Sequence, residues 1–146
     1  MSFTVDKIIR RESLTINGNA SIKDAINTMS RENVGLLVIV NDAGKPIGVV
    51  SERDIIRALA RGKDLNTKVT EVGVVGKLVT VSPRDSIYKA ASLMNDHKIR
   101  HLVVMDGDKL RGVISIRDII SEERVVSRLA ELAETKTIDT EISGAD

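Results

Sequence analysis

Two serine–aspartate pairs with the same spacing are the side chains of this sequence best suited to chemistry. Ser51 stands three residues before Asp54, and Ser115 stands three residues before Asp118. A hydroxyl can donate to a phosphate or sugar oxygen, and a carboxylate can accept both hydrogens of a ribose diol. The same spacing also suits a capping box, in which serine and aspartate each bond the other's backbone at the start of a helix. The pairs therefore predict ligand-binding positions, helix caps, or caps that also serve a ligand.

Both pairs lie in a segment that the chain contains twice. Residues 48–56 read GVVSERDII and residues 112–120 read GVISIRDII, so seven of nine positions are identical at an offset of 64. A repeat of this length indicates two copies of one supersecondary unit. Because the pair recurs in both copies after a glycine and two β-branched residues, we favour the ligand-binding interpretation over caps alone.

The repeat continues upstream and predicts the elements that must position the pairs. Short β-branched segments predict strands, apolar residues at i, i+3, i+4 and i+7 predict amphipathic helices, and turn residues between apolar runs predict hairpins. These segments are 14–16 and 79–81, 22–29 and 87–94, 36–40 and 102–105, and 48–50 and 112–114. Each copy thus reads strand, helix, strand, hairpin turn, strand, helix, with the second helix starting at Ser51 or Ser115.

One copy of about 60 residues buries too little surface to be secure alone. We therefore expect an α/β fold in which two β-α-β-β-α repeats, each with a three-stranded sheet, pack sheet to sheet about an approximate two-fold axis. The predicted organisation is repeat 1 over residues 1–64, repeat 2 over 65–123, and a C-terminal helix with a frayed tail over 124–146. Residues 71–76, with two glycines, are expected to be loosely ordered.

Composition restricts the partners that the chain can have. The 22 Lys and Arg nearly cancel the 21 Asp and Glu, so no overall field favours a nucleic-acid backbone. No apolar run approaches the roughly 20 residues that span a bilayer, and the N-terminus lacks the build of a signal peptide. With no cysteine, thiolate metal sites and disulfides are excluded. We expect a cytoplasmic protein with neither a membrane nor a nucleic-acid partner.

Catalysis and metal binding find no support in the residue pattern. The repeated serines have no histidine beside them, so no nucleophile-and-base set can be argued. His97 and His101 are four residues apart but lack a carboxylate cluster at ligand spacing. We therefore expect no enzyme, no catalytic residue and no metal site.

The Gly-hydrophobic-hydrophobic-Ser-x-x-Asp segment, preceded by an apolar strand and a hairpin, resembles the cystathionine β-synthase (CBS) domain. In that family, tandem pairs called Bateman modules form one disc with two clefts between their sheets. The resemblance runs from about Thr4 to Glu123. It implies a regulatory adenosine ligand (AMP, ADP, ATP or S-adenosylmethionine) and no tightly bound cofactor.

The resemblance also implies which residues contact the ligand. Those residues are Ser51 and Asp54 in one cleft, Ser115 and Asp118 in the other, Val49 and Val113 beside adenine, Leu14 and Val79 on the facing walls, and Arg100 and His101 toward the phosphates. Repeat 1 has Gly35 and Leu36 where repeat 2 has the basic pair, so the two clefts are not expected to fill equally.

One leading function and two alternatives remain open at this point. The first is a module that senses an adenosine nucleotide of the AMP, ADP or ATP class and signals to a partner protein that the sequence does not identify. The alternatives are a protein-interaction or dimerisation module without a ligand, or an S-adenosylmethionine sensor. The resemblance implies a homodimer, and Val125, Leu129 and Leu132 of a helix predicted over residues 121–134 are candidate contacts.

Overall fold

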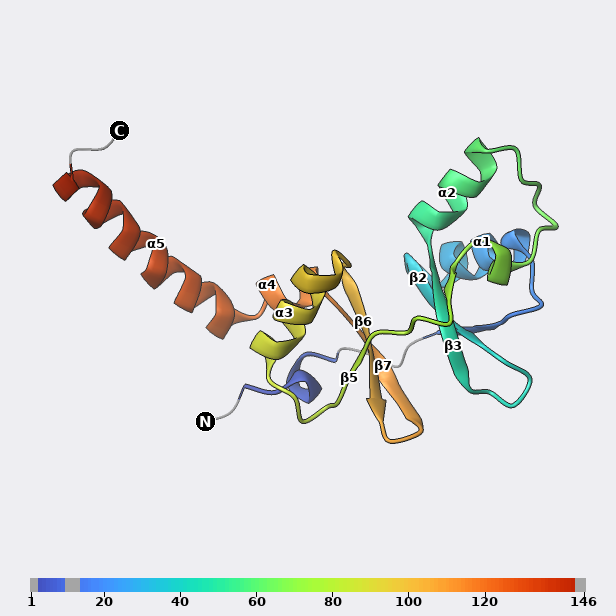
Figure 1. Cartoon of the computed structure of the whole chain (residues 1–146), viewed down its shortest axis with the longest axis horizontal. Helices are drawn as coiled ribbons and strands as arrows, with labels where there is room; N and C mark the ends of the chain where they lie inside the picture. Colours follow the sequence, from blue (N-terminus) through green and yellow to red (C-terminus); the bar gives the residue numbers. More distant parts are fainter. Residues whose placement is uncertain (1–2, 10–13, 144–146) are drawn as a thin grey trace.

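The computed structural model describes residues 3–9 and 14–143, with side chains described as far as Glu134. In Figure 1 the two repeats lie side by side, with their strands between them and their helices on the outer sides. The β-α-β-β-α order predicted for each repeat is confirmed. The first repeat comprises β1 (Thr15–Asn17), α1 (Ile22–Glu32), β2 (Leu36–Val40), β3 (Pro46–Ser51) and α2 (Glu52–Ala60). The second comprises β5 (Thr80–Val81), α3 (Ile87–His97), β6 (His101–Asp106), β7 (Lys109–Ser115) and α4 (Ile116–Ile120).

The first sheet contains a strand that the sequence did not reveal. Its order is β1-β2-β3-β4, whereas the second sheet has the order β5-β6-β7. The added strand β4 (Val74–Val75) pairs antiparallel with β3, so the expectation that residues 71–76 are loose, and that this sheet has three strands, is wrong. A Cβ at Gly48 would lie 2.2 Å from the Val74 carbonyl oxygen. Only glycine at position 48 therefore lets β4 approach β3.

The four helices of the repeats each begin at a serine whose hydroxyl accepts a backbone N–H. These N-cap residues are Ser21, Ser51, Ser86 and Ser115. In α1, α2 and α4 an aspartate three residues later completes a capping box. In α3 that position is Lys89, so only the serine half is present. Such caps satisfy backbone N–H groups that have no partner within the helix.

The central strands are buried on both faces, which explains their uninterrupted apolar sequences. In β2, Leu37 and Ile39 pack into the core beneath α1 and α2. Val38 is fully buried but belongs to neither helix-side core, and its equivalent in β6, Val103, behaves in the same way. Successive side chains of a strand point to opposite faces. Val38 and Val103 therefore mark the faces that the two sheets turn toward each other.

An N-terminal arm packs on the second repeat. Val5 donates its backbone N–H to the Asp85 carbonyl (2.9 Å), and Ile87 donates to the Phe3 carbonyl (2.9 Å). Val5 and Ile8, in the 3-10 turn η1 (Val5–Ile8), are buried in the core of the second repeat. The arm therefore completes a core that lies far from it in the sequence.

A matching arm, which precedes the second repeat, packs on the first repeat. Val69 donates its backbone N–H to the Ala20 carbonyl (2.8 Å), and Ile22 donates to the Thr67 carbonyl (2.9 Å). Val69, in the 3-10 turn η2 (Val69–Glu71), is fully buried in the core of the first repeat. The two repeats therefore exchange their leading segments.

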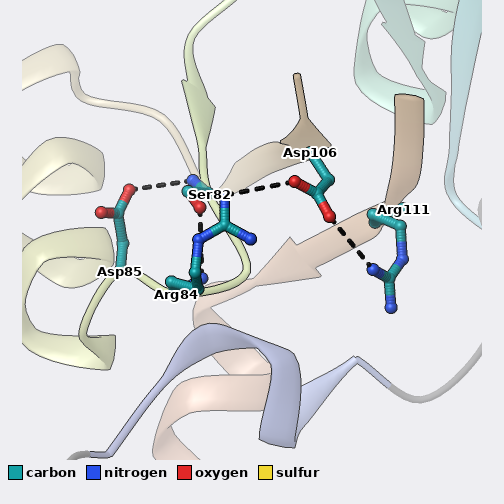
Figure 2. A network of polar contacts seen from close by, with 5 residues as sticks. All are labelled: Ser82, Arg84, Asp85, Asp106 and Arg111. Carbon is teal, nitrogen blue, oxygen red and sulfur yellow. Dashed lines mark hydrogen bonds and ion pairs between the residues drawn. The ribbon is translucent and has the colours of Figure 1, made fainter. Parts of the chain in front are cut away.

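A polar network supports the loop that receives the N-terminal arm (Figure 2). Asp85 accepts the Ser82 backbone N–H at 2.8 Å, and Arg84 donates to Asp106 at 3.2 Å. Asp106 also pairs with Arg111 at 3.6 Å, which joins the loop to the β6–β7 hairpin. The Ser82 hydrogen bond holds the pKa of the Asp85 carboxyl below its usual value. Asp85 is therefore charged at neutral pH, as the network requires.

The C-terminal helix is longer than the sequence pattern predicted. After α4 ends at Ile120, α5 (Glu123–Ser143) projects away from the rest of the chain (Figure 1). Val125 is buried in the second core, whereas Leu129 and Leu132 are each 51% exposed. The predicted frayed end, residues 144–146, lies outside the described residues. No helix within the described ranges is both long and apolar enough to cross a membrane.

Candidate functional site

An open groove of about 1270 Å³ lies between the repeats and brings together residues from both. Seven of the ten residues predicted to bind ligand line it. These are Val49, Ser51 and Asp54 from the first repeat, and Val79, Arg100, His101 and Ser115 from the second. Positions as far as 66 residues apart in the sequence therefore share one site, as a ligand that bridges the repeats would require.

The other three predicted residues are not among those that line the groove. Asp118 accepts the Ser115 backbone N–H at 2.8 Å and acts electrostatically on His101. Val113 pairs with Val103 between β7 and β6. Leu14 packs against the first core and adjoins residues 10–13, which lie outside the described residues. A second cleft formed by these residues stays a prediction.

Both serine–aspartate pairs form capping boxes. Ser51 donates its backbone N–H to Asp54 Oδ2 at 2.9 Å, and Asp54 donates its backbone N–H to Ser51 Oγ at 3.2 Å. The bonds between Ser115 and Asp118 measure 2.8 and 3.1 Å. A carboxylate has about four acceptor sites, and a serine that accepts still has its own proton to donate. The cap therefore fixes the Asp54 side chain at the groove while leaving it capacity for a ligand.

Part of the lining of the groove is aliphatic. Val49 of β3 lies in register with Val38 of β2 and with Val74 of β4. Val49, Val74, Val79 and Val103 all line the groove, and no Phe, Tyr or Trp of the described residues does. A base could therefore bind here between branched aliphatic side chains.

Basic side chains are numerous among the residues that line the groove. Six basic side chains line it, namely Arg53, Arg57, Lys77, Lys98, Arg100 and Arg117. Glu52 and Asp54 are the carboxylates among the described lining residues. Since the whole chain has a net charge of only +1, this concentration of positive charge is local. A groove of one charge sign attracts ligands of the opposite sign.

Sequence reasoning identified only Arg100 among these cations as a ligand residue. Arg53 and Arg117 lie within the repeated segment itself, which was a signal that could have found them. Lys98 stands two residues before Arg100, at the end of α3, in a left-handed conformation with φ of 56°. Lys77 lies beyond β4, whose place beside β3 no local pattern predicted. The fold brings these residues together.

His101 lies on the groove wall at the start of β6. Burial lowers the pKa of its imidazole, Arg100 lowers it further, and Asp118 opposes the shift. A histidine with a lowered pKa is neutral at pH 7. Among the lining residues from Lys98 to Arg117, the positive charge at that pH therefore comes from Lys98, Arg100 and Arg117.

Comparison with known proteins identifies the family. The model of the CBS domain matches residues 5–61 and again residues 69–124. The chain belongs to the CBS domain family. As a tandem CBS pair, it superposes on a CBS domain protein of Pyrobaculum aerophilum complexed with AMP, with a TM-score of 0.80 and 31% sequence identity over 88% of this chain and 99% of that one.

Two further comparisons bear on the CBS assignment. The CBS domain-containing protein YhcV of Bacillus subtilis is 33% identical over 82% of this chain and 87% of its own length. A CBS domain pair solved with 5′-methylthioadenosine and S-adenosyl-L-methionine has a TM-score of 0.74 at 23% identity over 90% of this chain and 98% of that one, a likeness of fold alone. The chain spans 41% and 35% of the length of the first two curated relatives that it matches.

Proposed function

We propose that this CBS pair is a cytoplasmic regulatory module that binds an adenosine nucleotide in its groove and signals the occupied state to a partner protein. The observation that carries the proposal is that Asp54 of the first repeat, six basic side chains including Arg100, and several valines line the same groove. The similarity to a CBS protein complexed with AMP supports the same ligand class.

The residues of the groove suit the three parts of such a ligand. In the proposed complex, Asp54 accepts the ribose hydroxyls, Val49 and Val79 contact the base, and the basic rim binds the phosphates. Because both repeats line the groove, the ligand favours the arrangement that lets it contact both at once. It shifts the population of arrangements by its difference in affinity between them. We propose that the partner protein responds to this shift.

Ligand binding is expected to raise the thermal stability of the chain. A nucleotide at a hundred times its dissociation constant adds about 2.7 kcal/mol, which for a chain of this size raises Tm by about 5 to 10 °C. The measurement is a thermal-shift series with AMP, ADP, ATP and S-adenosylmethionine. A shift with S-adenosylmethionine alone would favour that sensor instead. An unchanged Tm with all four compounds would favour a protein-interaction module in which the pairs are caps only.

We also propose that the module forms a homodimer. The exposed apolar residues of α5, Val126, Leu129 and Leu132, are each about half exposed and offer contact area to a second copy. Light scattering is expected to give twice the mass of one chain, and Leu129→Glu is expected to reduce that mass because a carboxylate would be buried in the contact. A single-chain mass for the unaltered protein would contradict the proposal.

A further inference from the structure

The helix α5 turns a polar side toward the rest of its own chain. The Arg124 guanidinium lies 5.1 Å from the centre of the Phe3 ring, and Arg128, one turn further on, lines a surface cleft with Phe3. Residues three or four apart lie on one side of a helix. Another side of α5 therefore carries three apolar residues that are each about half exposed, Val126, Leu129 and Leu132. Since helices in proteins are stabilised mainly by packing of their apolar side, this side suits a second surface.

A matching apolar surface lies on the first repeat, where the ligand groove continues between α1 and α2. The lining there consists of Ile26 and Met29 of α1 and Ile55, Ile56 and Leu59 of α2. Ile56 is 66% exposed and Leu59 is 38% exposed. This part of the groove, here called the helix groove, is therefore apolar and open to solvent.

The corresponding place in the second repeat is closed, and α5 begins there. At offsets of 64 or 65, the residues equivalent to the lining of the helix groove do not line the groove: Ala91, Met94, Ile119, Ile120 and Glu123. Met94 and Ile119 are instead buried in the same core as Val125 of α5. In the first repeat, α2 is followed by a linker over residues 61–68 and not by a helix. The first repeat thus lacks the helix that packs on the second.

The α5 helix of the same chain does not fill the helix groove. It starts at Glu123, directly after α4, and in Figure 1 it leads away from the second repeat on the side opposite α1 and α2. A helix that occupies the helix groove must therefore come from another molecule. A second copy of this chain supplies one with an uncovered apolar side, and the exchange can be reciprocal about a two-fold axis.

The charges beside the two apolar surfaces are of opposite sign. The end of α2 that carries Leu59 is basic, and its neighbours include Arg57, Arg61 and Lys63. The carboxylates Glu52 and Asp54 lie at the other end of that helix. On α5, Glu123 and Glu134 border the side that carries the exposed apolar residues, as their spacing from Val126 shows. Such complementarity favours one orientation of the two helices over the reverse.

We propose that α5 of a second copy of this chain lies in the helix groove, with its Leu129 and Leu132 against Ile56 and Leu59, and that the two copies do this reciprocally. The second copy's helix then borders the ligand groove, because Ile56 and Leu59 line both. This inference rests on the homodimer of the proposed function and assigns the surface that receives α5.

Cross-linking tests the contact directly, because the chain has no cysteine. Full-length Ile56→Cys, with a tag that changes its size, is mixed with untagged Leu129→Cys, equilibrated and oxidised. A disulfide requires Cα atoms within about 7 Å, so this mixture is expected to give at least about five times more linked heterodimer than the control mixture. The control is Ile120→Cys with Leu129→Cys, since Ile120 is the equivalent of Ile56 in the second repeat and is 51% exposed.

Sedimentation equilibrium supplies a second measurement. Ile56→Glu is expected to raise the dimer dissociation constant at least about tenfold, because a carboxylate would be buried in each of two contacts, whereas Ile120→Glu is expected to leave it unchanged. Equal cross-linking in the two mixtures, or equal weakening by the two glutamates, would overturn the inference while the homodimer stands. A single-chain mass for the unaltered protein would overturn the homodimer as well, and nucleotide binding, measured separately, would be unaffected by either result.

Discussion

Asp54→Ala is expected to lower the affinity for AMP about a hundredfold while lowering the free energy of unfolding by only about 1 kcal/mol. The affinity loss follows because two ribose hydroxyls lose a charged acceptor, and two such bonds at the low end of their range, about 1.5 kcal/mol each, correspond to about a hundredfold. The smaller stability loss follows because the capping box of α2 loses one of its two bonds. Calorimetric titration and chemical denaturation measure the two quantities separately.

Asp24→Ala provides the matched control within the same chain. The box of Ser21 and Asp24 has bonds of 2.9 and 3.2 Å, the same as those of Ser51 and Asp54. The Ser21 backbone bond lowers the pKa of Asp24, so that carboxylate is charged at neutral pH. Asp24 does not line the groove. The control is expected to lose stability but no AMP affinity, and equal affinity losses in both variants would refute a ligand role for Asp54.

Val5→Ala and Val69→Ala are each expected to lower the free energy of unfolding by about 2–3 kcal/mol. Both side chains are fully buried, and each truncation removes about two methyl groups and leaves a cavity. Because Val5 lies in the second core and Val69 in the first, the losses should add in the double variant. The sum, about 4–6 kcal/mol, is comparable with the whole stability of many domains.

Denaturant titration of the two single variants and the double variant measures these losses. Val126→Ala is the control, since Val126 is 47% exposed, and its expected cost is about 0.5 kcal/mol. If each arm were only loosely attached, both core substitutions would cost no more than the control. Additive losses in one cooperative transition would show that both arms hold the folded chain together.

The elements of each repeat could be predicted because their signals are local. Ile22, Ala25 and Met29, spaced along one helical face, are all buried in the structure. The serine–aspartate spacing likewise predicted the helix starts at Ser51 and Ser115. In each case residues a few positions apart determine the element.

Features that depend on distant contacts could not be predicted in the same way. The strand Val74–Val75 forms because Gly48, 26 residues earlier, leaves room for it. The arms that contain Val5 and Val69 have no amphipathic pattern long enough to show which core they enter. Lys77 and Lys98 line the groove because of the tertiary fold, and no local pattern places them there. Seven of the ten residues predicted to bind ligand thus line the groove, whereas five of its six basic side chains were not predicted as ligand residues.

The short strand β4 also affects how the protein behaves toward other copies of itself. The edge of a sheet presents unpaired N–H and C=O groups that can recruit a strand from another molecule. Here the free edge of β3 pairs with only the two residues of β4. The chain then turns away at Gly76, which has a φ of 86°. A strand this short is a poor template for further pairing. The residues that link the repeats thus also protect the first sheet against edge-to-edge aggregation.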